Sequence, residues 1–455
     1  MQQLNPAKPQ LEGCDKSEHD HGVSDNGIVT EELLIDNSFP TTKIARQSSI
    51  LGALRSTVGW LILSNGMKLG VGIWATRYLE PKDYALLATV LAIQGFAIGM
   101  TAFNMSSELV RAKKIDKDDL SVAWTCDAIR NLVIWSSLFL LAPIVAGWLQ
   151  RPDAVIPLRV SISVLLVSLL ISPRLVELRR SGRFGALGMI DGLTSIGYAI
   201  VTVTFVLIFK NYWALIIAGI FTPLFQAVIS HALVPWRPRL HFDLARAKPM
   251  AKLGIVLLAL TWIAALCEHG MVFLISNAVT DNELGFYNRA LTFSYSLAFV
   301  ASGVFWRVAY PIYSRHSIEG GNPLADASKA QAWILLVALP LAAIGIVWRD
   351  FWIGSVLGVK WQPMAEIWSL LIIAGTLLLA NAPFEAAFQA SRREGSGMLI
   401  NGMSAAVQLI SAWMLLPILG LNAAGVGIVA AACFSVVCFR IAARRHRGIL
   451  TQAEL

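Results

Sequence analysis

A sequence of 455 residues that is 56% hydrophobic and only 15% charged does not fit a soluble protein, which at this length carries about a quarter charged residues. The mean hydropathy of +0.62 supports the same exclusion. The formal charge of +8 does not indicate nucleic-acid binding, because no basic run is long enough to form such a region. Membrane proteins carry a basic excess because they keep lysines and arginines on the cytoplasmic side.

The apolar residues fall into blocks of roughly 20 residues, the length at which an α-helix crosses about 30 Å of hydrocarbon. Strands of a membrane β-barrel alternate in polarity, whereas these blocks are apolar on all sides. The sequence therefore predicts an all-α polytopic membrane protein with about 12 transmembrane helices.

The chain divides by composition into five parts. Residues 1–45 are polar and acidic and lack the basic start and apolar stretch of a signal peptide, which predicts a disordered cytoplasmic tail. Two lobes of six helices are expected at 46–234 and 253–441, joined by a polar cytoplasmic linker at 235–252. A basic cytoplasmic tail at 442–455 closes the chain.

Each lobe contains six apolar blocks that we interpret as membrane spans. In the first lobe they are 54–76, 83–103, 124–149, 155–172, 187–208 and 213–234. In the second lobe they are 253–277, 290–312, 330–348, 364–383, 398–418 and 421–440. Two sets with the same orientation indicate parallel repeats, an arrangement found in secondary transporters.

The distribution of basic residues tests this topology. When the loops are assigned alternately from a cytoplasmic N-terminus, about 24 lysines and arginines fall inside and about 8 outside. This bias predicts that both termini are cytoplasmic. The predicted outer loops are short, so whatever the protein does takes place among its helices.

Seven stretches over residues 45–440 carry a resemblance to a known family through their order and spacing: RYLEPKDYALLATVLAIQGFA, FNMSSELVRAKKIDKDDLSVAWTCDAIRN, LLAPIVAGWLQRPD, YWALIIAGIFTPLFQAVISHALVPWRPRL, ELGFYNRALTF, WRVAYPIYSR and LGVKWQPMAEIWSLL. The pattern resembles the oligosaccharide flippases of the MOP superfamily, in particular the Wzx-like branch. The resemblance implies two six-helix lobes arranged in a V around a central cavity.

The same resemblance implies a function. The substrate would be an oligosaccharide joined by pyrophosphate to a polyprenyl lipid, moved by alternating access across the inner membrane for exopolysaccharide, capsule or O-antigen synthesis. Membrane lipids are expected partners, and a polysaccharide polymerase and a chain-length regulator are expected to work beside such a flippase.

No cofactor or metal is expected. The five cysteines show neither a CxxC pair nor the spacing of metal ligands. No nucleotide-binding motif is present, so transport is not expected to use ATP directly.

Ionisable residues inside spans are costly and mark the candidate substrate path. Lys68 and Glu268 lie about 14 and 15 residues into the first and seventh spans, which hold matching positions in parallel repeats. The hypothesis is that both face the cavity, where Lys68 would attract pyrophosphate or an acidic sugar as a compact cation. Glu268, beside His269, would balance this charge or carry a coupling proton. A structural ion pair between the lobes, or an outward-reaching Lys68, is the alternative.

Two arginines complete the predicted binding residues. Arg130 lies three residues after Asp127, on one helical face, so a local ion pair is favoured over a role in guiding an anionic headgroup. Arg307 lies near the cytoplasmic end of the eighth span, and contact with lipid headgroups or with substrate phosphate both stay open. Asp191 is interpreted as a polar group at a helix end and is left out of the site.

Other functions are weighed against this one. A multidrug exporter of the same superfamily would favour an acidic cavity for cations, whereas Lys68, Arg130 and Arg307 favour an anionic cargo. A membrane polysaccharide polymerase would be expected to carry a long outer loop with catalytic groups, so no enzyme is predicted. The glycines of a GxxxG motif, Gly66 and Gly70, predict close helix packing or a bend in the first span.

Overall fold

The computed structural model describes residues 50–101, 117–243, 268–319 and 321–453, together with 262, 265 and 266. Within these ranges the chain consists of helices and their connections, with no strand, which confirms the predicted all-α fold class. The predicted tail at 1–45 lies outside the described residues, and Ser49–Leu455 form one compact unit.

The first half of the chain holds the following helical elements: α1 (Ile50–Thr76), α2 (Pro81–Thr101), α4 (Lys117–Trp148), η1 (Pro152–Ala154), α5 (Val155–Ser161), α6 (Val164–Val167), η2 (Ser168–Leu170), α7 (Leu175–Arg180), α8 (Phe184–Phe209) and α9 (Trp213–Leu233). Residues 234–243 continue without helix, and the rest of the predicted linker lies outside the described residues.

In the second half, helical residues at 268–275 precede α11 (Asp281–Ile318), α12 (Pro323–Val347), α13 (Arg349–Trp352), η3 (Ile353–Leu357), η4 (Val359–Met364), α14 (Ala365–Leu379), α15 (Ala382–Ala390), α16 (Glu394–Leu419) and α17 (Asn422–Ala453). The predicted tail at 442–455 is therefore helical through Ala453, as a continuation of α17.

Two predicted spans are broken. The fourth is divided among α5, α6 and η2, where the Ser163 hydroxyl donates to the Arg159 carbonyl at 3.3 Å and the Ser168 hydroxyl to the Leu165 carbonyl at 2.7 Å. Such bonds compete with the regular helical ladder. The tenth is divided between α14 and α15, where Pro383 falls in the first turn of the new helix.

Nine helical segments of the described residues are long and apolar enough to cross a membrane. α1 and α2 are not among these nine. α1 carries the polar residues Ser64, Asn65 and Lys68 in its middle, which lowers its hydropathy. The total of about 12 spans stays a prediction.

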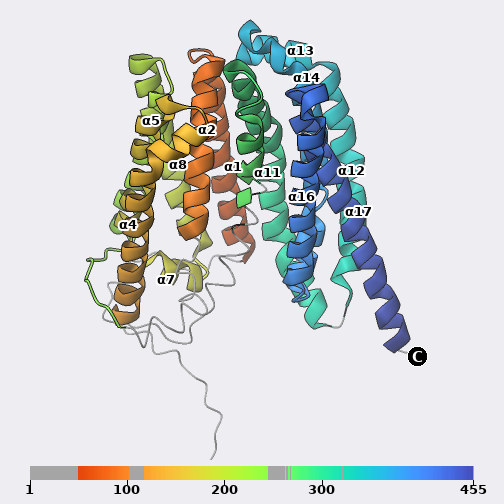
Figure 1. The fold of residues 1–455 in the computed structure, drawn as a ribbon. Coiled ribbons are helices and arrows are strands. Elements are labelled where there is room, and N and C mark those ends of the chain that lie inside the picture. The colour runs from red at the N-terminus through yellow and green to blue at the C-terminus, as the bar shows by residue number, and fades with distance from the viewer. Residues whose placement is uncertain are drawn as a thin grey trace, which may run out of the picture. The chain divides into compact units, whose positions relative to one another are not determined.

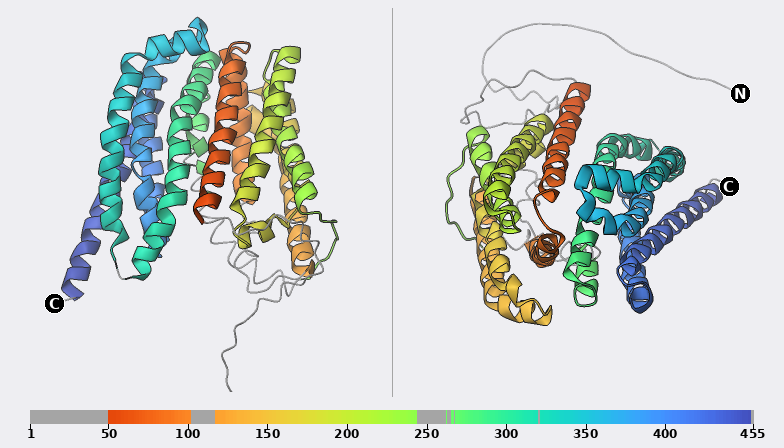
Figure 2. Two further views of the ribbon diagram at one scale, coloured as in Figure 1. Left: turned by 180° about the vertical axis from the view of Figure 1, so that it is seen from behind. Right: turned by 90° about the horizontal axis from the view of Figure 1, so that it is seen from above.

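The helices run between two ends of the bundle. α7 and the C-terminus lie at one end and α13 at the other (Figure 1); we call these the α7 end and the α13 end. α1 packs along α8, and α2 packs along α11, which also contacts α1. In the view along the helices, α1, α2, α4 and α8 gather on one side and α11, α12, α16 and α17 on the other (Figure 2).

The close packing of α1 uses glycines of α8 rather than its own. A Cβ at Gly192 would lie 2.2 Å from the Trp60 ring, and one at Gly188 3.0 Å from Trp60 Cβ. The Ser64 and Ser195 hydroxyls lie 2.7 Å apart across the same interface. A Cβ at Gly66 or Gly70 would meet no described atom within 4 Å, so close packing through the GxxxG motif is wrong for this part of the chain.

Candidate functional site

A cavity of about 290 Å³ lies where α1, α8, α9 and α11 meet. Most of the described residues that line it are of polar or charged types, and they come from both halves of the chain: Leu61, Ser64, Asn65, Lys68, Gly188, Asp191, Thr194, Thr222, Gln226, Phe299 and Arg307. Two of the predicted binding residues, Lys68 and Arg307, are therefore brought to one cavity.

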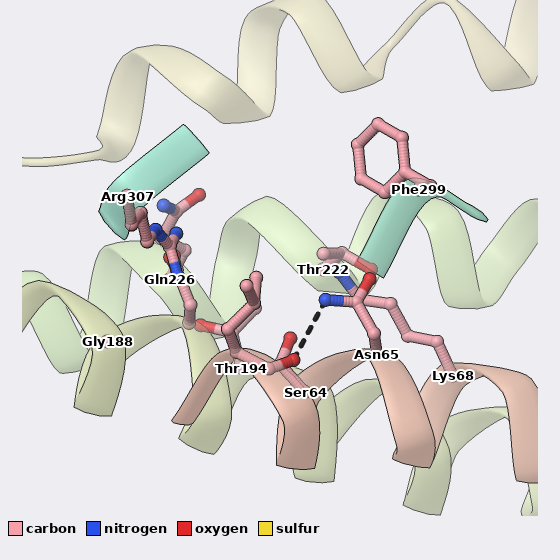
Figure 3. A pocket seen from close by; sticks show the side chains of 11 residues that line it. Ser64, Asn65, Lys68, Gly188, Thr194, Thr222, Gln226, Phe299 and Arg307 are labelled. Atoms are coloured by element: carbon pink, nitrogen blue, oxygen red, sulfur yellow. Dashed lines mark hydrogen bonds between the residues drawn. The ribbon is translucent and has the colours of Figure 1, made fainter. Parts of the chain in front are cut away.

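The two cations occupy opposite ends of the lining. Figure 3 shows Arg307 near Gln226 at one end and Lys68 near Asn65 at the other, with Thr194 between them. Neither cation makes an ion pair or hydrogen bond with another described residue. Charges at membrane depth are costly unless they meet a partner or face a water-filled space, so both remain available to an anion.

The uncharged lining residues offer hydrogen bonds. The Asn65 side-chain amide donates to the Leu61 carbonyl at 2.8 Å, which leaves its carbonyl oxygen for another partner. The Thr222 hydroxyl donates to the Ala218 carbonyl at 2.9 Å and keeps its acceptor sites. Such groups suit sugar hydroxyls.

Asp191 was missed as a site residue from the sequence. It lines the same cavity as both cations, two turns inside α8, rather than closing a helix end. A feature of the sequence could have indicated this position: Asp191 lies between Gly188 and Gly192, the two glycines against which Trp60 of α1 packs.

The other predicted residues lie elsewhere. Glu268 is exposed and His269 is half-buried against Phe96, with ring centroids 6.2 Å apart, and neither is among the described residues that line the cavity. Arg130 donates to Asp127 at 2.7 Å and to the Asn131 side chain at 3.1 Å. The local ion pair expected from the spacing is therefore present, away from the cavity lining.

At the α13 end, side chains of each half donate to backbone carbonyls of the other half. The Arg77 guanidinium, just after α1, donates to the carbonyls of Ser355 at 3.0 Å and Val356 at 3.2 Å. The two halves are also joined by an ion pair between the side chains of Arg151, in the first half, and Asp281, in the second.

The reverse contacts come from η4. The Lys360 ammonium donates to the carbonyls of Arg77 at 3.1 Å and Leu79 at 2.6 Å, and the Trp361 indole donates to the carbonyl of Thr76 at 3.0 Å. These carbonyls end α1, where cations and donors are favourable. We call the bonds made by Arg77, Lys360 and Trp361 the α13-end contact.

Large side chains pack directly beneath this contact. Trp361 is fully buried and meets Tyr84 and Phe286 edge-on, with ring centroids 5.4 Å and 5.9 Å away. Arg289 lies over the Tyr84 ring at 4.0 Å. Arg289 is itself buried and lies inside α11.

Comparison with known proteins decides the family. A family model described as "Polysaccharide biosynthesis protein" matches residues 75–366, more than half of the chain. The chain belongs to this family. The match confirms the family resemblance found in the sequence, and it includes Arg307 and the α13-end contact from Arg77 to Trp361, whereas Lys68 lies just before it.

Two similar proteins have informative names. Lipopolysaccharide biosynthesis protein WzxC of Escherichia coli (strain K12) is 23% identical over 359 residues, covering 76% of this chain and 71% of the relative. Teichuronic acid biosynthesis protein TuaB of Bacillus subtilis (strain 168) is 23% identical over 294 residues, covering 63% of this chain and 60% of the relative.

Solved structures share the fold of this family member. An inward-facing multidrug resistance MATE family transporter of the MOP superfamily superposes with a TM-score of 0.69 at 13% identity, over 88% of this chain and all of that one. Lipid II flippase MurJ in an inward closed conformation gives 0.66 at 12% identity, over 87% and 88%. These likenesses concern the fold and confirm the MOP-like fold class.

Removing the indole of Trp361 tests whether the α13-end contact stabilises this fold. The Trp361→Ala variant is expected to lose about 3–5 kcal/mol of stability, because a fully buried tryptophan leaves a cavity. Thermal unfolding of the purified protein in detergent measures the loss. Trp333→Ala on α12 is the control, since Trp333 is 68% exposed; an equal loss in both variants would contradict the packing role of Trp361.

Proposed function

We propose that this protein is a flippase for polyprenyl-pyrophosphate-linked oligosaccharide units, which it moves from the cytoplasmic to the outer leaflet of the inner membrane for cell-surface polysaccharide synthesis. The observation that carries the proposal is the cavity between α1, α8, α9 and α11. It holds two cations without ion-pair partners among the described residues, in a member of the polysaccharide biosynthesis family.

The lining matches the chemistry of such a cargo. A guanidinium such as that of Arg307 binds phosphate oxygens in a bidentate way, and the Lys68 ammonium acts as a compact point charge. Asn65, Thr222 and Gln226 offer hydrogen bonds to sugar hydroxyls. A volume of about 290 Å³ suits the charged linkage and the first sugar, so the remaining sugars and the lipid extend beyond it.

The different character of the two ends of the bundle supports transport by alternating access. The α7 end carries Arg174, Arg179 and Arg180, and by the positive-inside rule this basic excess supports a cytoplasmic position for that end. The α13 end then faces outward and is closed by the α13-end contact. The hydrogen bonds donated by the charged side chains of Arg77 and Lys360 contribute about 1.5–3 kcal/mol each and the bond donated by Trp361 about 0.5–1.5 kcal/mol, and each can be exchanged singly for water when the end opens.

We further propose the orientation of the protein, its partners and the source of energy for transport. Both termini lie in the cytoplasm, and the cargo passes to a polysaccharide polymerase and a chain-length regulator on the outer face. An ion gradient, the membrane potential or substrate supply drives the cycle, and Glu268 and His269, on the helix before α11, are the candidate coupling pair for an ion gradient.

One observation favours a second function, the export of small cationic molecules. The fold is shared with a multidrug resistance transporter, and Asp191 places a carboxylate in the cavity. The described lining contains two cations, Lys68 and Arg307, and this one carboxylate. Its net charge is therefore positive, which disfavours a cationic cargo.

The leaflet distribution of lipid-linked oligosaccharides in cells lacking the protein tests the proposal. We expect complete units to accumulate on the cytoplasmic leaflet while surface polysaccharide is lost. Complete units on the outer leaflet that stay unpolymerised would instead indicate a polymerase. An unchanged pool would contradict the flippase and favour the exporter.

A further inference from the structure

The backbone at Asp191 is held against α1, while its carboxylate is not engaged. The Ser195 hydroxyl donates to the Asp191 backbone carbonyl at 2.8 Å, and the Ser64 hydroxyl lies 2.7 Å from that of Ser195. The carboxylate itself lines the cavity and makes no hydrogen bond or ion pair with another described residue. An unpaired carboxylate at membrane depth is costly, so its presence in a cavity wall indicates a role there.

Lys68 and Arg307 are the two described cations that line the cavity together with Asp191, yet neither forms an ion pair with it. The three charged residues among the described part of the lining therefore sum to one net positive charge. Without direct contact, Asp191 lowers the positive potential of the cavity and leaves both cations free to reach a ligand.

A carrier must release its cargo as well as bind it. A cavity with two uncompensated cations would hold a pyrophosphate tightly and let it go slowly, because productive passage requires binding that is favourable but weak enough to leave. A fixed carboxylate near both cations offsets part of that attraction.

We propose that Asp191 is the counter-charge that sets the affinity of the cavity for an anionic cargo and so permits release. This inference rests on the proposed function, since it takes the pyrophosphate-linked lipid as the cargo. Asp191 acts through Lys68 and Arg307 and is in this sense a specificity-determining residue for anions.

The isosteric Asp191→Asn variant removes the charge at nearly constant volume. Binding is measured on the full chain in lipid nanodiscs with a fluorescent polyprenyl pyrophosphate, and with the matching uncharged polyprenol. We expect Asp191→Asn to bind the pyrophosphate about tenfold tighter, as one unit charge several ångströms away implies, and the polyprenol equally well. Transport by this variant falls although its binding is stronger.

Two further variants sharpen the test. Adding Lys68→Gln to Asp191→Asn is expected to return the affinity toward that of the parent protein. Asp153→Asn, which removes an exposed carboxylate in η1, is expected to change nothing.

The outcomes separate this inference from the function on which it rests. Binding of the pyrophosphate by the parent protein with no tightening in Asp191→Asn overturns the counter-charge role alone. Equal tightening for pyrophosphate and polyprenol also overturns it, because the effect is then not electrostatic. If neither protein distinguishes the pyrophosphate from the polyprenol, the proposed function fails as well.

Discussion

Replacing Lys68 with Gln is expected to reduce transport of the lipid-linked oligosaccharide at least tenfold while leaving the amount of protein in the membrane unchanged. Lys68 lines the cavity and has no ion-pair partner among the described residues, so its loss does not leave another buried charge unpaired. A hydrogen bond to a charged group contributes about 1.5–3 kcal/mol, which corresponds to about ten- to a hundredfold in binding. Surface polysaccharide and membrane abundance are measured in the same cells.

Three variants control this result. Lys68→Arg keeps the charge and is expected to retain much of the transport. Lys82→Gln removes a cation that pairs with Glu80 at the exposed surface and is expected to have no effect. Arg130→Gln leaves Asp127 without its ion-pair partner and is expected to lower abundance together with transport. A parallel loss of abundance in Lys68→Gln would contradict the binding role and leave a structural one.

A second large loss of transport is expected from a substitution at Gly285, where α11 contacts α2 at the α13 end. A Cβ at Gly285 would lie 1.9 Å from the Pro81 carbonyl oxygen, and a backbone atom cannot move aside as a flexible side chain does. Gly285→Ala therefore forces the two helices apart and opens the closed end. We expect transport to fall at least tenfold because the closed state is lost, at a cost comparable to overpacking a core, about 1–3 kcal/mol.

Opening is measured by labelling. A cysteine at Ala290, which is fully buried in α11, is introduced into a chain without native cysteines and treated with a membrane-impermeant thiol reagent from outside. The Gly285→Ala protein is expected to be labelled, whereas Gly70→Ala, where a new Cβ meets no described atom within 4 Å, is not. Labelling that stays absent in Gly285→Ala would contradict the outward-closed assignment.

A milder variant guards against misfolding. Arg77→Ala combined with Lys360→Ala removes hydrogen bonds of the α13-end contact without adding bulk. It is expected to increase labelling of the cysteine at position 290, by less than Gly285→Ala does, and to leave the abundance of the protein normal.

The fold was predictable because its signal is spread over whole spans. Blocks of apolar residues and the alternation of basic loops require no knowledge of which side chains meet. The breaks in the fourth and tenth spans were not predicted, since they depend on local serine bonds and on Pro383 inside runs of high hydropathy.

The site was predictable only in part. Lys68 and Arg307 stand out as charges in apolar blocks, and both line the cavity. Glu268 was expected at the same depth as Lys68 but is not among the described residues of the lining, because depth along a helix does not fix the direction in which a side chain points. Asp191 was interpreted as a helix-end group although it lies two turns inside α8, because an error of a few residues in a span boundary changes a membrane position into a surface one.

The α13-end contact could not be read from the sequence for a different reason. Its acceptors are backbone carbonyls of Thr76, Arg77 and Leu79 in one half and of Ser355 and Val356 in the other. Every residue has such a carbonyl, so no pattern of side chains marks these positions.

Transfer between leaflets by the purified protein tests the central claim most directly. The full chain is reconstituted into liposomes with a fluorescent polyprenyl-pyrophosphate-linked saccharide, and an added membrane-impermeant quencher reports its arrival on the outer leaflet. We expect the parent protein to transfer the pyrophosphate-linked lipid and Lys68→Gln to transfer little of it. We expect no transfer of a lipid that carries a cationic headgroup in place of the pyrophosphate and saccharide. Equal transfer of the pyrophosphate-linked and cationic lipids, or transfer that Lys68→Gln leaves unchanged, would contradict the central claim.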